Sequence, residues 1–360
     1  MIRVLIIITT GFSQYGGLAS VVMNYLRNID FTDLKIDILS LNEPEEELLN
    51  ECRTLGIKYI RLSGRSKNPI GYMLSLKRIL KQYDVAHINA NSATAAIELM
   101  AAKMAGVQNR IVHNHTAKCD HVVAHKILVP IYKRLYTDAI ACSSRAGDWI
   151  FGPNNFLILN NSIDTDKYSF SELSRSKIRG QYNISKNTFV VGHVGKIYKP
   201  KNHKKILDIF KAVNSKNSQS VLLLVGDGEM RAEIELYAKD CGVDKNVIFA
   251  GMQKNTYEYL SALDCFLFPS LWEGMPLALL EAQASGVKCV ISDTIDKDVA
   301  ICKDVIIHSL DDPDDKWADD VLLAMHYDRA DACKRNKVAI QSNNYDVHLN
   351  ANKLREMYIK

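Results

Sequence analysis

The chain has 360 residues, of which 47% are hydrophobic and 24% charged, and its formal net charge is +4. A chain of this length usually splits into two domains rather than enlarging one core. The charge is too weak to indicate nucleic-acid binding, and no apolar run reaches the roughly 20 residues of a membrane-spanning helix. The eight cysteines are scattered without a CxxC pair, which favours reduced thiols in a cytosolic protein and no structural metal site.

Short apolar runs alternate with helical patterns along most of the chain. The N-terminal MIRVLIIITT lacks the cleavage site of a secretion signal and is predicted to form the first buried strand. Further strands of the first half are expected at KIDILSL, KYIRL, VAHIN, RIVHNH, DAIACS and FLILNN, with helices between them, for example over 17 to 28 and 92 to 105. Strands of the second half are expected at TFVVGHVG, SVLLLVGDG, NVIFAG, CFLFPS, KCVISD and VIIHSL. This alternation is typical of parallel sheets with crossover helices.

The polar stretch 164 to 187 contains no predicted strand and marks the boundary between two halves of the same kind. We therefore expect an α/β protein with two Rossmann-like domains whose parallel sheets face a central cleft, which is the default site. The expected division is an N-terminal domain over 1–165, a connection over 166–185, a C-terminal domain over 186–342, and a tail over about 343–360 that packs back on the N-terminal domain.

Three strand ends of the second half carry glycine, in GHVGK, GDGE and AGMQ. Turns of this kind point backbone N–H groups at a ligand above the strands, which suits a phosphate. None of them is GxGxxG, so the nicotinamide fingerprint is missing. Each glycine pair taken singly is more typical of a tight turn, and only their recurrence in one sheet favours a ligand site.

Charged side chains occur near the same strand ends. Lys196 and Lys201, in GKIYKPKNH, could neutralise a diphosphate or belong to a solvated basic loop. Glu273 and Glu281 interrupt the otherwise apolar FPSLWEGMPLALLEAQASG, in which Pro276 can occupy the first turn of a helix. The plain alternative is favourable helix-start electrostatics for Glu273 and a surface position for Glu281. That alternative does not explain the aromatic and apolar residues around them.

The first half offers a glycine pair and a histidine pair. Gly16 and Gly17 open a helix after the first strand. His113 and His115 lie two apart on a strand and therefore on one face. They could form half of a metal site, but no third ligand is visible by spacing, so a hydrogen-bonding role is favoured.

Taken together, these segments resemble a known family. GGLASVVMNYL, HNHT, NNSIDTDKY, VGHVGKIYKPKNH, LLLVGDGE, VIFAGMQ and FPSLWEGMPLALLEAQASGVKCVISD occur in the order found in the retaining GT-B glycosyltransferases of the family 4 type. The last segment matches the E-x7-E motif of that family, and the resemblance extends from residue 1 to about 310. The branch it resembles builds bacterial exopolysaccharide and capsule, and it implies the GT-B fold.

The resemblance implies a role for each matching residue. Glu281 would bind the ribose of a nucleotide sugar, and Glu273 would hold hydroxyls of the transferred sugar. Lys196 and Lys201 would neutralise the diphosphate, although many relatives carry Arg where Lys196 stands. His115 would contact the donor sugar, so that Glu273, His115 and Lys201 form the catalytic set. Backbone N–H groups would assist the diphosphate from Gly274, Met275, Leu277 and the Gly16–Gly17 pair.

The expected activity is that of a retaining hexosyltransferase that moves a sugar from a nucleotide diphosphate sugar, expected to be a UDP-sugar, to a glycan or lipid-linked acceptor. No cofactor and no metal are expected, because the lysines and helix N-termini would stabilise the leaving group. We favour attack by the acceptor on the same face as the leaving group over a covalent intermediate. A sugar-nucleotide epimerase of the same double-domain type and a non-catalytic partner in a polysaccharide assembly complex remain alternatives.

The expected location is the cytoplasm, with peripheral attachment to the inner face of the membrane. Residues 52 to 83 contain eight basic residues and no acidic one. Such a stretch can bind an anionic membrane surface. The alternative is an ordinary helix over 71 to 82 that packs on the sheet with a solvated basic edge, because Met73, Leu76 and Leu80 recur on one side.

Overall fold

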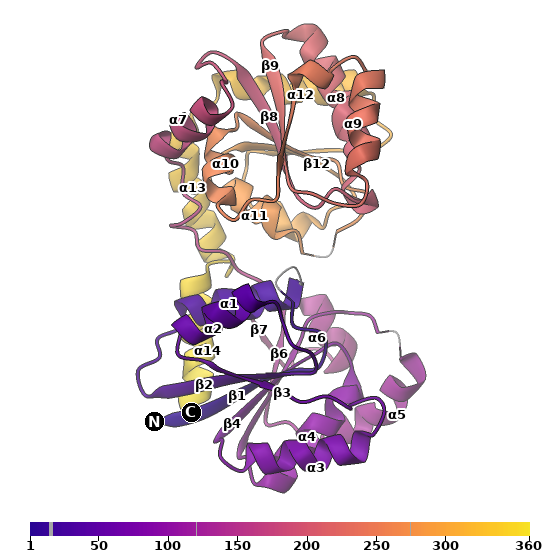
Figure 1. Ribbon diagram of the computed structural model, residues 1–360, viewed down its shortest axis with the longest axis vertical. Coiled ribbons are helices and arrows are strands. Elements are labelled where there is room, and N and C mark those ends of the chain that lie inside the picture. The colour runs from indigo at the N-terminus through magenta and orange to yellow at the C-terminus, as the bar shows by residue number, and fades with distance from the viewer. Residues whose placement is uncertain (14–16, 120, 274) are drawn as a thin grey trace. The chain divides into compact units, whose positions relative to one another are not determined.

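A computed structural model describes residues 1–13, 17–119, 121–273 and 275–360. The chain divides into two compact units (Figure 1). Unit 1 comprises Met1–Ser162 together with Val347–Lys360, and unit 2 comprises Ile163–Asp346.

Unit 1 is built on a parallel sheet of seven strands among the described residues. Their order across the sheet is β3 (Lys58–Arg61), β2 (Leu34–Ser40), β1 (Ile2–Ile8), β4 (Val85–Ala90), β5 (Asn109–Asn114), β6 (Asp138–Ala141) and β7 (Leu157–Ile158). The order reverses direction between β1 and β4, which makes this the topological switch point of the sheet. All seven strands lie where the apolar runs predict them.

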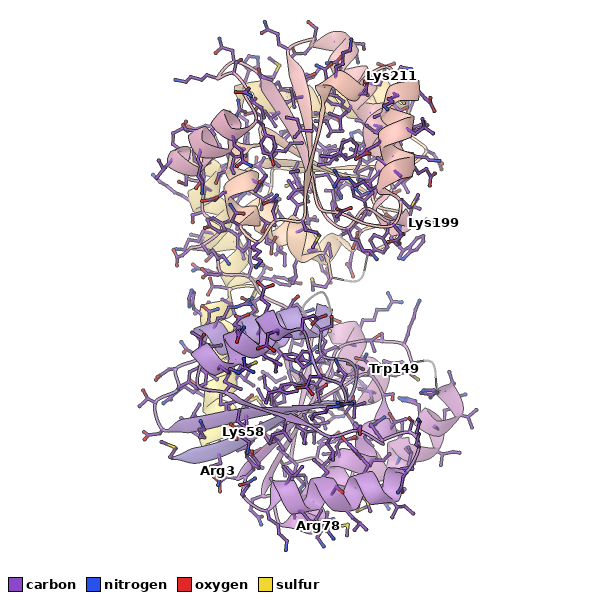
Figure 2. The ribbon with its side chains drawn as sticks, viewed as in Figure 1. Arg3, Lys58, Arg78, Trp149, Lys199 and Lys211 are labelled. Carbon is purple, nitrogen blue, oxygen red and sulfur yellow. The ribbon has the colours of Figure 1, made fainter. Side chains whose placement is uncertain are left out.

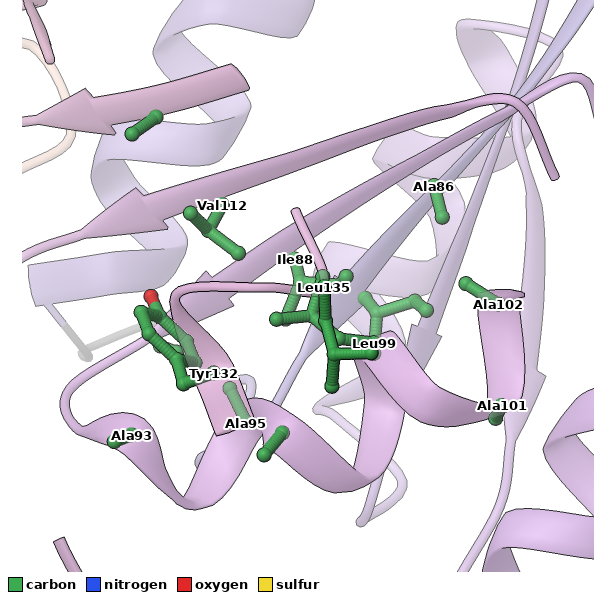
Figure 3. Packing of buried hydrophobic residues seen from close by; sticks show 14 of the residues in the cluster. Ala86, Ile88, Ala93, Ala95, Leu99, Ala101, Ala102, Val112, Tyr132 and Leu135 are labelled. Carbon is green, nitrogen blue, oxygen red and sulfur yellow. The ribbon is translucent and has the colours of Figure 1, made fainter. Parts of the chain in front are cut away.

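Alternate residues of β1 face two separate cores, as the period of two in a strand requires. Leu5 and Ile7 join one cluster, whereas Val4, Ile6 and Ile8 join the other. The first cluster lies under the helices on one face of the sheet, and Figure 3 shows Ile88, Leu99 and Leu135 within it. These helices are η1 (Ala93–Ala95), α3 (Pro69–Leu80), α4 (Ala96–Ala105), α5 (Val122–Tyr132) and α6 (Ser144–Ile150). The second cluster lies under α1 (Gly17–Asn28), α2 (Glu46–Thr54) and the C-terminal α14 (Val347–Ile359).

Unit 2 repeats this plan with six described parallel strands. Their order is β10 (Val247–Gly251), β9 (Ser220–Val225), β8 (Phe189–Val194), β11 (Cys265–Phe268), β12 (Lys288–Ser292) and β13 (Val305–His308). This is the classical doubly wound order, with its switch point between β8 and β11. The six strands again coincide with the predicted apolar runs, and the two-sheet α/β architecture predicted from the sequence is confirmed.

Helices cover both faces of this second sheet. One face carries α7 (Glu172–Gln181), α10 (Thr256–Ala262), α11 (Leu277–Ala284) and α13 (Arg329–Ser342), and the other carries α8 (His203–Lys216), α9 (Arg231–Asp240) and α12 (Asp314–Leu322). The remaining short helices are η2 (Lys199–Lys201), η3 (Asp244–Asn246), η4 (Lys297–Val299) and η5 (Leu323–His326).

The segment 166–185, which the sequence indicates as a connection, packs within unit 2 instead. Its helix α7 buries Ile178 in the core of that unit. Arg175 and Arg179 both form ion pairs with Asp264, at 2.6 and 2.7 Å. The polar composition therefore reflects charged anchoring to the sheet rather than a linker. The two units divide between Ser162 and Ile163 and again between Asp346 and Val347.

The basic stretch 52 to 83 is less free than its composition suggests. Arg53 and Arg61 pair with glutamates outside the stretch, and Arg65 pairs with the fully buried Glu98 at 2.7 Å. In α3, Leu76 and Leu80 are completely buried, so that side of the helix faces the core. Figure 2 shows Lys58 and Arg78 at the surface of unit 1.

The sequence predicts reduced thiols and no membrane-spanning helix. Each of the eight cysteines, all of which fall in the described ranges, is free. Among the described residues, no helix is both long and apolar enough to cross a bilayer.

Candidate functional site in two strand-end clusters

In unit 2, the candidate residues gather at the switch point of the sheet. The loop after β8 carries Lys196 and Lys201, and the loop after β11 carries Glu273. The two loops are joined directly, because the Leu271 N–H donates to the Pro200 carbonyl at 2.8 Å and the Asn202 side chain donates to the Pro269 carbonyl at 3.1 Å. Ligands of doubly wound sheets bind at the carboxyl ends of the strands at this point.

Glycine allows a third loop to pack closely against the first. A Cβ at Gly226, whose φ is +139°, would lie 2.0 Å from the carbonyl oxygen of Gly195, and one at Gly228 would lie 2.2 Å from that of Ile197. The Ile197 N–H donates to the Asp227 carbonyl at 2.9 Å. The GDG segment therefore packs closely against the backbone of the loop that carries Lys196 and Lys201. Its glycines allow this close approach of two backbone segments.

Lys201 and Glu273 form a buried ion pair. Their Nζ and Oε1 atoms are 2.7 Å apart, and the side chains are only 11% and 9% exposed. The Lys201 ammonium also lies 4.4 Å from the centre of the Phe268 ring. Nearby, burial and the charge of Lys201 lower the pKa of His203 to about 4, so this ring is neutral at physiological pH. Glu273 is therefore the anionic partner of a buried cation at the switch point.

Lys196 lies in a different environment although it is only five residues away. Its ammonium pairs with Glu229 at 3.0 Å, and both side chains are 59% exposed. The backbone N–H of Glu229 and then the hydrogen bond from Lys196 lower the pKa of the Glu229 carboxyl. Exposed pairs contribute little to stability. Lys196 is thus held loosely and Lys201 firmly.

Glu281 is half-buried and is the fifth residue of α11, eight residues after Glu273. Burial raises the pKa of its carboxyl, although a hydrogen bond from Tyr168 and the charge of Lys167 act in the opposite direction. Glu281 is therefore partly buried rather than fully exposed at the surface. Pro276 is the residue before α11 rather than part of its first turn, and α11 begins at Leu277.

Two expected backbone donors lie at the start of α11. Met275 and Leu277 both pack against the core of unit 2. The Leu277 N–H donates to the Met275 carbonyl at 3.0 Å. Gly274 and Gly16 lie outside the described residues. Gly17 is the first residue of α1 in unit 1, and a Cβ there would meet nothing within 4 Å.

In unit 1, histidines gather near the corresponding switch point between β1 and β4. The rings of His113 and His115 are 4.1 Å apart, which confirms that they share one face. His87 on β4 stacks on His113 at 5.6 Å. Burial lowers the pKa of His87 and of His115 to about 3 and that of His113 well below its usual value. The three rings are therefore neutral at physiological pH.

Asn89 determines which nitrogen of His115 carries the proton. The Asn89 side-chain oxygen lies 2.8 Å from His115 Nε2, and a carboxamide oxygen can only accept. Nε2 must therefore donate, which leaves Nδ1 of the neutral ring as an acceptor. The cluster around His115 can bind a hydroxyl group, which agrees with a hydrogen-bonding role.

The sequence and the fold of this chain are similar to those of known glycosyltransferases. The sequence profile of the family Glycosyl transferases group 1 matches residues 174–331. The putative glycosyltransferase EpsF of Bacillus subtilis is 29% identical over 366 residues, which cover 95% of this chain and 93% of EpsF. The UDP-Gal:alpha-D-GlcNAc-diphosphoundecaprenol alpha-1,3-galactosyltransferase of Escherichia coli is 28% identical over 239 residues, or 61% of each chain. The crystal structure of Anabaena Alr3699/HepE in complex with UDP matches with a TM-score of 0.80 and 16% identity over 99% of both chains.

The chain matches the group 1 glycosyltransferases over residues 174–331, which lie within unit 2. Its two parallel-sheet domains have the GT-B fold, as the resemblance implies.

Sequence reasoning missed several of the contacts described above. Asn89 could have been found, because it is the last residue but one of β4, and the neighbouring strand β5 ends one residue before His115. Phe268 appears in the same motif as Glu273 but gave no signal that Lys201 packs on it. Tyr168 lies in the segment that seemed to be a connection, so nothing in the sequence linked it to Glu281.

Proposed function

We propose that this glycosyltransferase transfers a sugar from a UDP-sugar to a glycan or lipid-linked acceptor in exopolysaccharide or capsule synthesis, with retention of anomeric configuration. The observation that carries the proposal is the buried Lys201–Glu273 pair at the switch point of unit 2. The relatives support it, because HepE was crystallised with UDP and the Escherichia coli relative is named for UDP-Gal and a diphosphoundecaprenol acceptor.

The structure suggests distinct roles for the two lysines. Lys201 is fixed by Glu273 and Phe268, so it can meet the diphosphate without losing much side-chain freedom. Lys196 must first exchange its exposed pair with Glu229 for the ligand. Glu281 would accept hydrogen bonds from the ribose hydroxyls, with Tyr168 beside it. His115 would accept a hydrogen bond from a donor-sugar hydroxyl at Nδ1.

The proposed chemistry is a substitution on one face of the donor sugar. The bond between the anomeric carbon and the β-phosphate oxygen breaks, and the acceptor oxygen forms a bond to the same carbon. The acceptor proton passes to the departing phosphate, and Lys201 and Lys196 neutralise the charge that develops on UDP. Glu273 holds sugar hydroxyls in this scheme and forms no covalent intermediate. No divalent ion is required.

The family match favours sugar transfer over the two alternatives. An epimerase would release an inverted donor without an acceptor, and a non-catalytic partner would have no use for a buried cation paired with Glu273 at a strand end.

A screen of nucleotide sugars with the purified chain and EDTA tests the proposal. We expect slow hydrolysis of one UDP-sugar, and NMR should show that the released sugar first appears with the anomeric configuration of the donor. Glu273→Ala should lower kcat at least about tenfold, or roughly 1.4 kcal/mol. Loss of activity in EDTA, or an inverted product, would contradict the scheme.

We further propose that the enzyme works in the cytoplasm at the inner face of the membrane, where a lipid-linked acceptor would be found. Within 52 to 83, Lys67, Lys77 and Lys81 make no ion pair with the described residues, whereas Arg65 is occupied by Glu98. Reversing these three lysines to Glu should weaken sedimentation with anionic vesicles. Unchanged sedimentation would assign this stretch to a solvated face.

A further inference from the structure

One helix of unit 1 exposes apolar side chains on the side that faces away from the core. In α5, Val123 is 74% exposed, Ile127 67% and Ile131 44%. These residues are four apart and therefore lie one above the other on a single side of the helix. Val122 at the start of α5 is 51% exposed, and Pro130 is also exposed.

The opposite side of α5 is firmly attached to unit 1. His125 accepts a hydrogen bond from the Ala93 N–H at 3.2 Å, and its ring stacks on Trp149 at 4.4 Å. Tyr132 is completely buried and packs near Phe151. The helix is thus a fixed element with two apolar sides, although the solvent side of a surface helix is normally polar. We call the exposed row formed by Val123, Ile127 and Ile131 the α5 stripe.

Basic residues border the α5 stripe. Lys126 lies beside it, Lys133 and Arg134 follow the helix, and all three are exposed without an ion pair among the described residues. No acidic residue occurs from 121 to 137. An exposed apolar patch usually marks an interaction surface. Cations around an apolar stripe suit a surface that is anionic outside and apolar inside.

We propose that the α5 stripe inserts into the headgroup region of an anionic phospholipid bilayer. A helix that lies in the bilayer interface has this pattern of an apolar side with Lys and Arg at its edge. A second copy of the chain fits less well, because a two-fold interface would bring Lys126 and Lys133 against the same residues of the other copy. The inference rests on the proposed function, since it places the enzyme where a lipid-linked acceptor lies.

Vesicle sedimentation of the full chain tests this surface. Vesicles of phosphatidylglycerol and phosphatidylcholine should pull the protein down, and phosphatidylcholine alone should do so weakly. Val123→Asp with Ile127→Asp should lower the partition coefficient at least about tenfold, because two apolar contacts become charged. Leu173→Asp with Leu236→Asp is the matched control, because those leucines are 82% and 60% exposed in unit 2 and their replacement should change partition less than about twofold.

A second variant reports insertion without disrupting it. Ile127→Trp should shift its fluorescence to shorter wavelength on anionic vesicles and be quenched by brominated lipid, whereas Leu236→Trp should show neither effect. The proposal is overturned if the wild type does not bind anionic vesicles or if the α5 double variant binds them like the wild type. It is also overturned if the only effect of that variant is to convert a dimer to a monomer in sedimentation velocity.

The same variants separate this inference from the proposed function. The α5 double variant should keep the hydrolysis of the UDP-sugar and lose transfer to an acceptor presented in vesicles. Vesicle binding is measured without any nucleotide, so a chain that binds through α5 but hydrolyses no sugar nucleotide would refute the proposed function alone. Equal transfer by wild type and α5 variant would refute the role of the stripe alone.

Discussion

Removing the charge of Glu273 should destabilise unit 2 much more than removing an exposed carboxylate. Glu273→Gln keeps the shape of the side chain but leaves the Lys201 ammonium buried without its counter-ion at 2.7 Å. A buried charge without a partner is costly, because neither water nor an opposite charge compensates its lost solvation. The ring of Phe268 offers only part of that compensation.

The magnitude follows from the distance and the burial. Two unit charges 2.7 Å apart attract by about 6 kcal/mol at an effective dielectric constant of about 20, and desolvation offsets much of this. Breaking such a pair on one side typically costs about 3 kcal/mol. For a unit of this size, the melting temperature should fall by roughly 6 to 12 °C. Lys201→Met with Glu273→Gln should recover about 2 kcal/mol of the summed losses of the single variants.

The wild type, the two single variants and the double variant form a double-mutant cycle. Urea unfolding of these four proteins measures the coupling energy between Lys201 and Glu273. The matched control is the Lys204–Glu233 pair, which has a similar distance of 2.6 Å but side chains that are half exposed. Its coupling should stay below about 1 kcal/mol. Equal coupling in the two cycles would refute the claim that Lys201 and Glu273 act as a buried pair.

Three further predictions concern the supporting structure. Asn89→Leu should lower kcat/KM for the donor about tenfold, because His115 loses the acceptor that fixes its tautomer. Asn89→Asp should retain activity at high pH and lose it as the pH falls, because the His115 ring then becomes protonated. A flat pH profile of the Asp variant would contradict this. Arg329→Met should lower the free energy of unfolding in urea by at least about 3 kcal/mol, because Arg329 donates to four backbone carbonyls near the ends of α10 and α11. A loss below about 1 kcal/mol would be inconsistent with these contacts. Burial lowers the pKa values of His87, His113 and His115, so below about pH 6.5 the unfolded chain binds protons that the folded chain does not. The free energy of unfolding should therefore fall as the pH falls below about 6.5, by roughly 1.4 kcal/mol per pH unit for each ring that only the unfolded chain protonates. Constant melting temperatures from pH 7 to 5 would refute this.

The sheets were predictable because their strands are buried on both faces. Such strands appear as nearly continuous apolar runs, and CFLF or VLLLV can hardly be placed elsewhere. The helix α7 was not predictable in the same way. It is held by Arg175 and Arg179 on Asp264, and long-range ion pairs leave no local pattern in the sequence.

The candidate site was predictable by motif but not by environment. Spacing treated Lys196 and Lys201 as equivalent, whereas the short helix η2 turns Lys201 inward to Glu273 and leaves Lys196 outside with Glu229. The α5 stripe also escaped notice, because an apolar helix in a sequence is expected to be buried.

The most direct test of the central claim is calorimetric titration of the chain with UDP and UMP in the presence of EDTA. The proposed site predicts that UDP binds at least about tenfold more tightly than UMP, because Lys201 meets the second phosphate, and that Lys201→Met removes most of this preference. Equal affinity for UDP and UMP in the wild type, or an unchanged preference in Lys201→Met, would contradict the account.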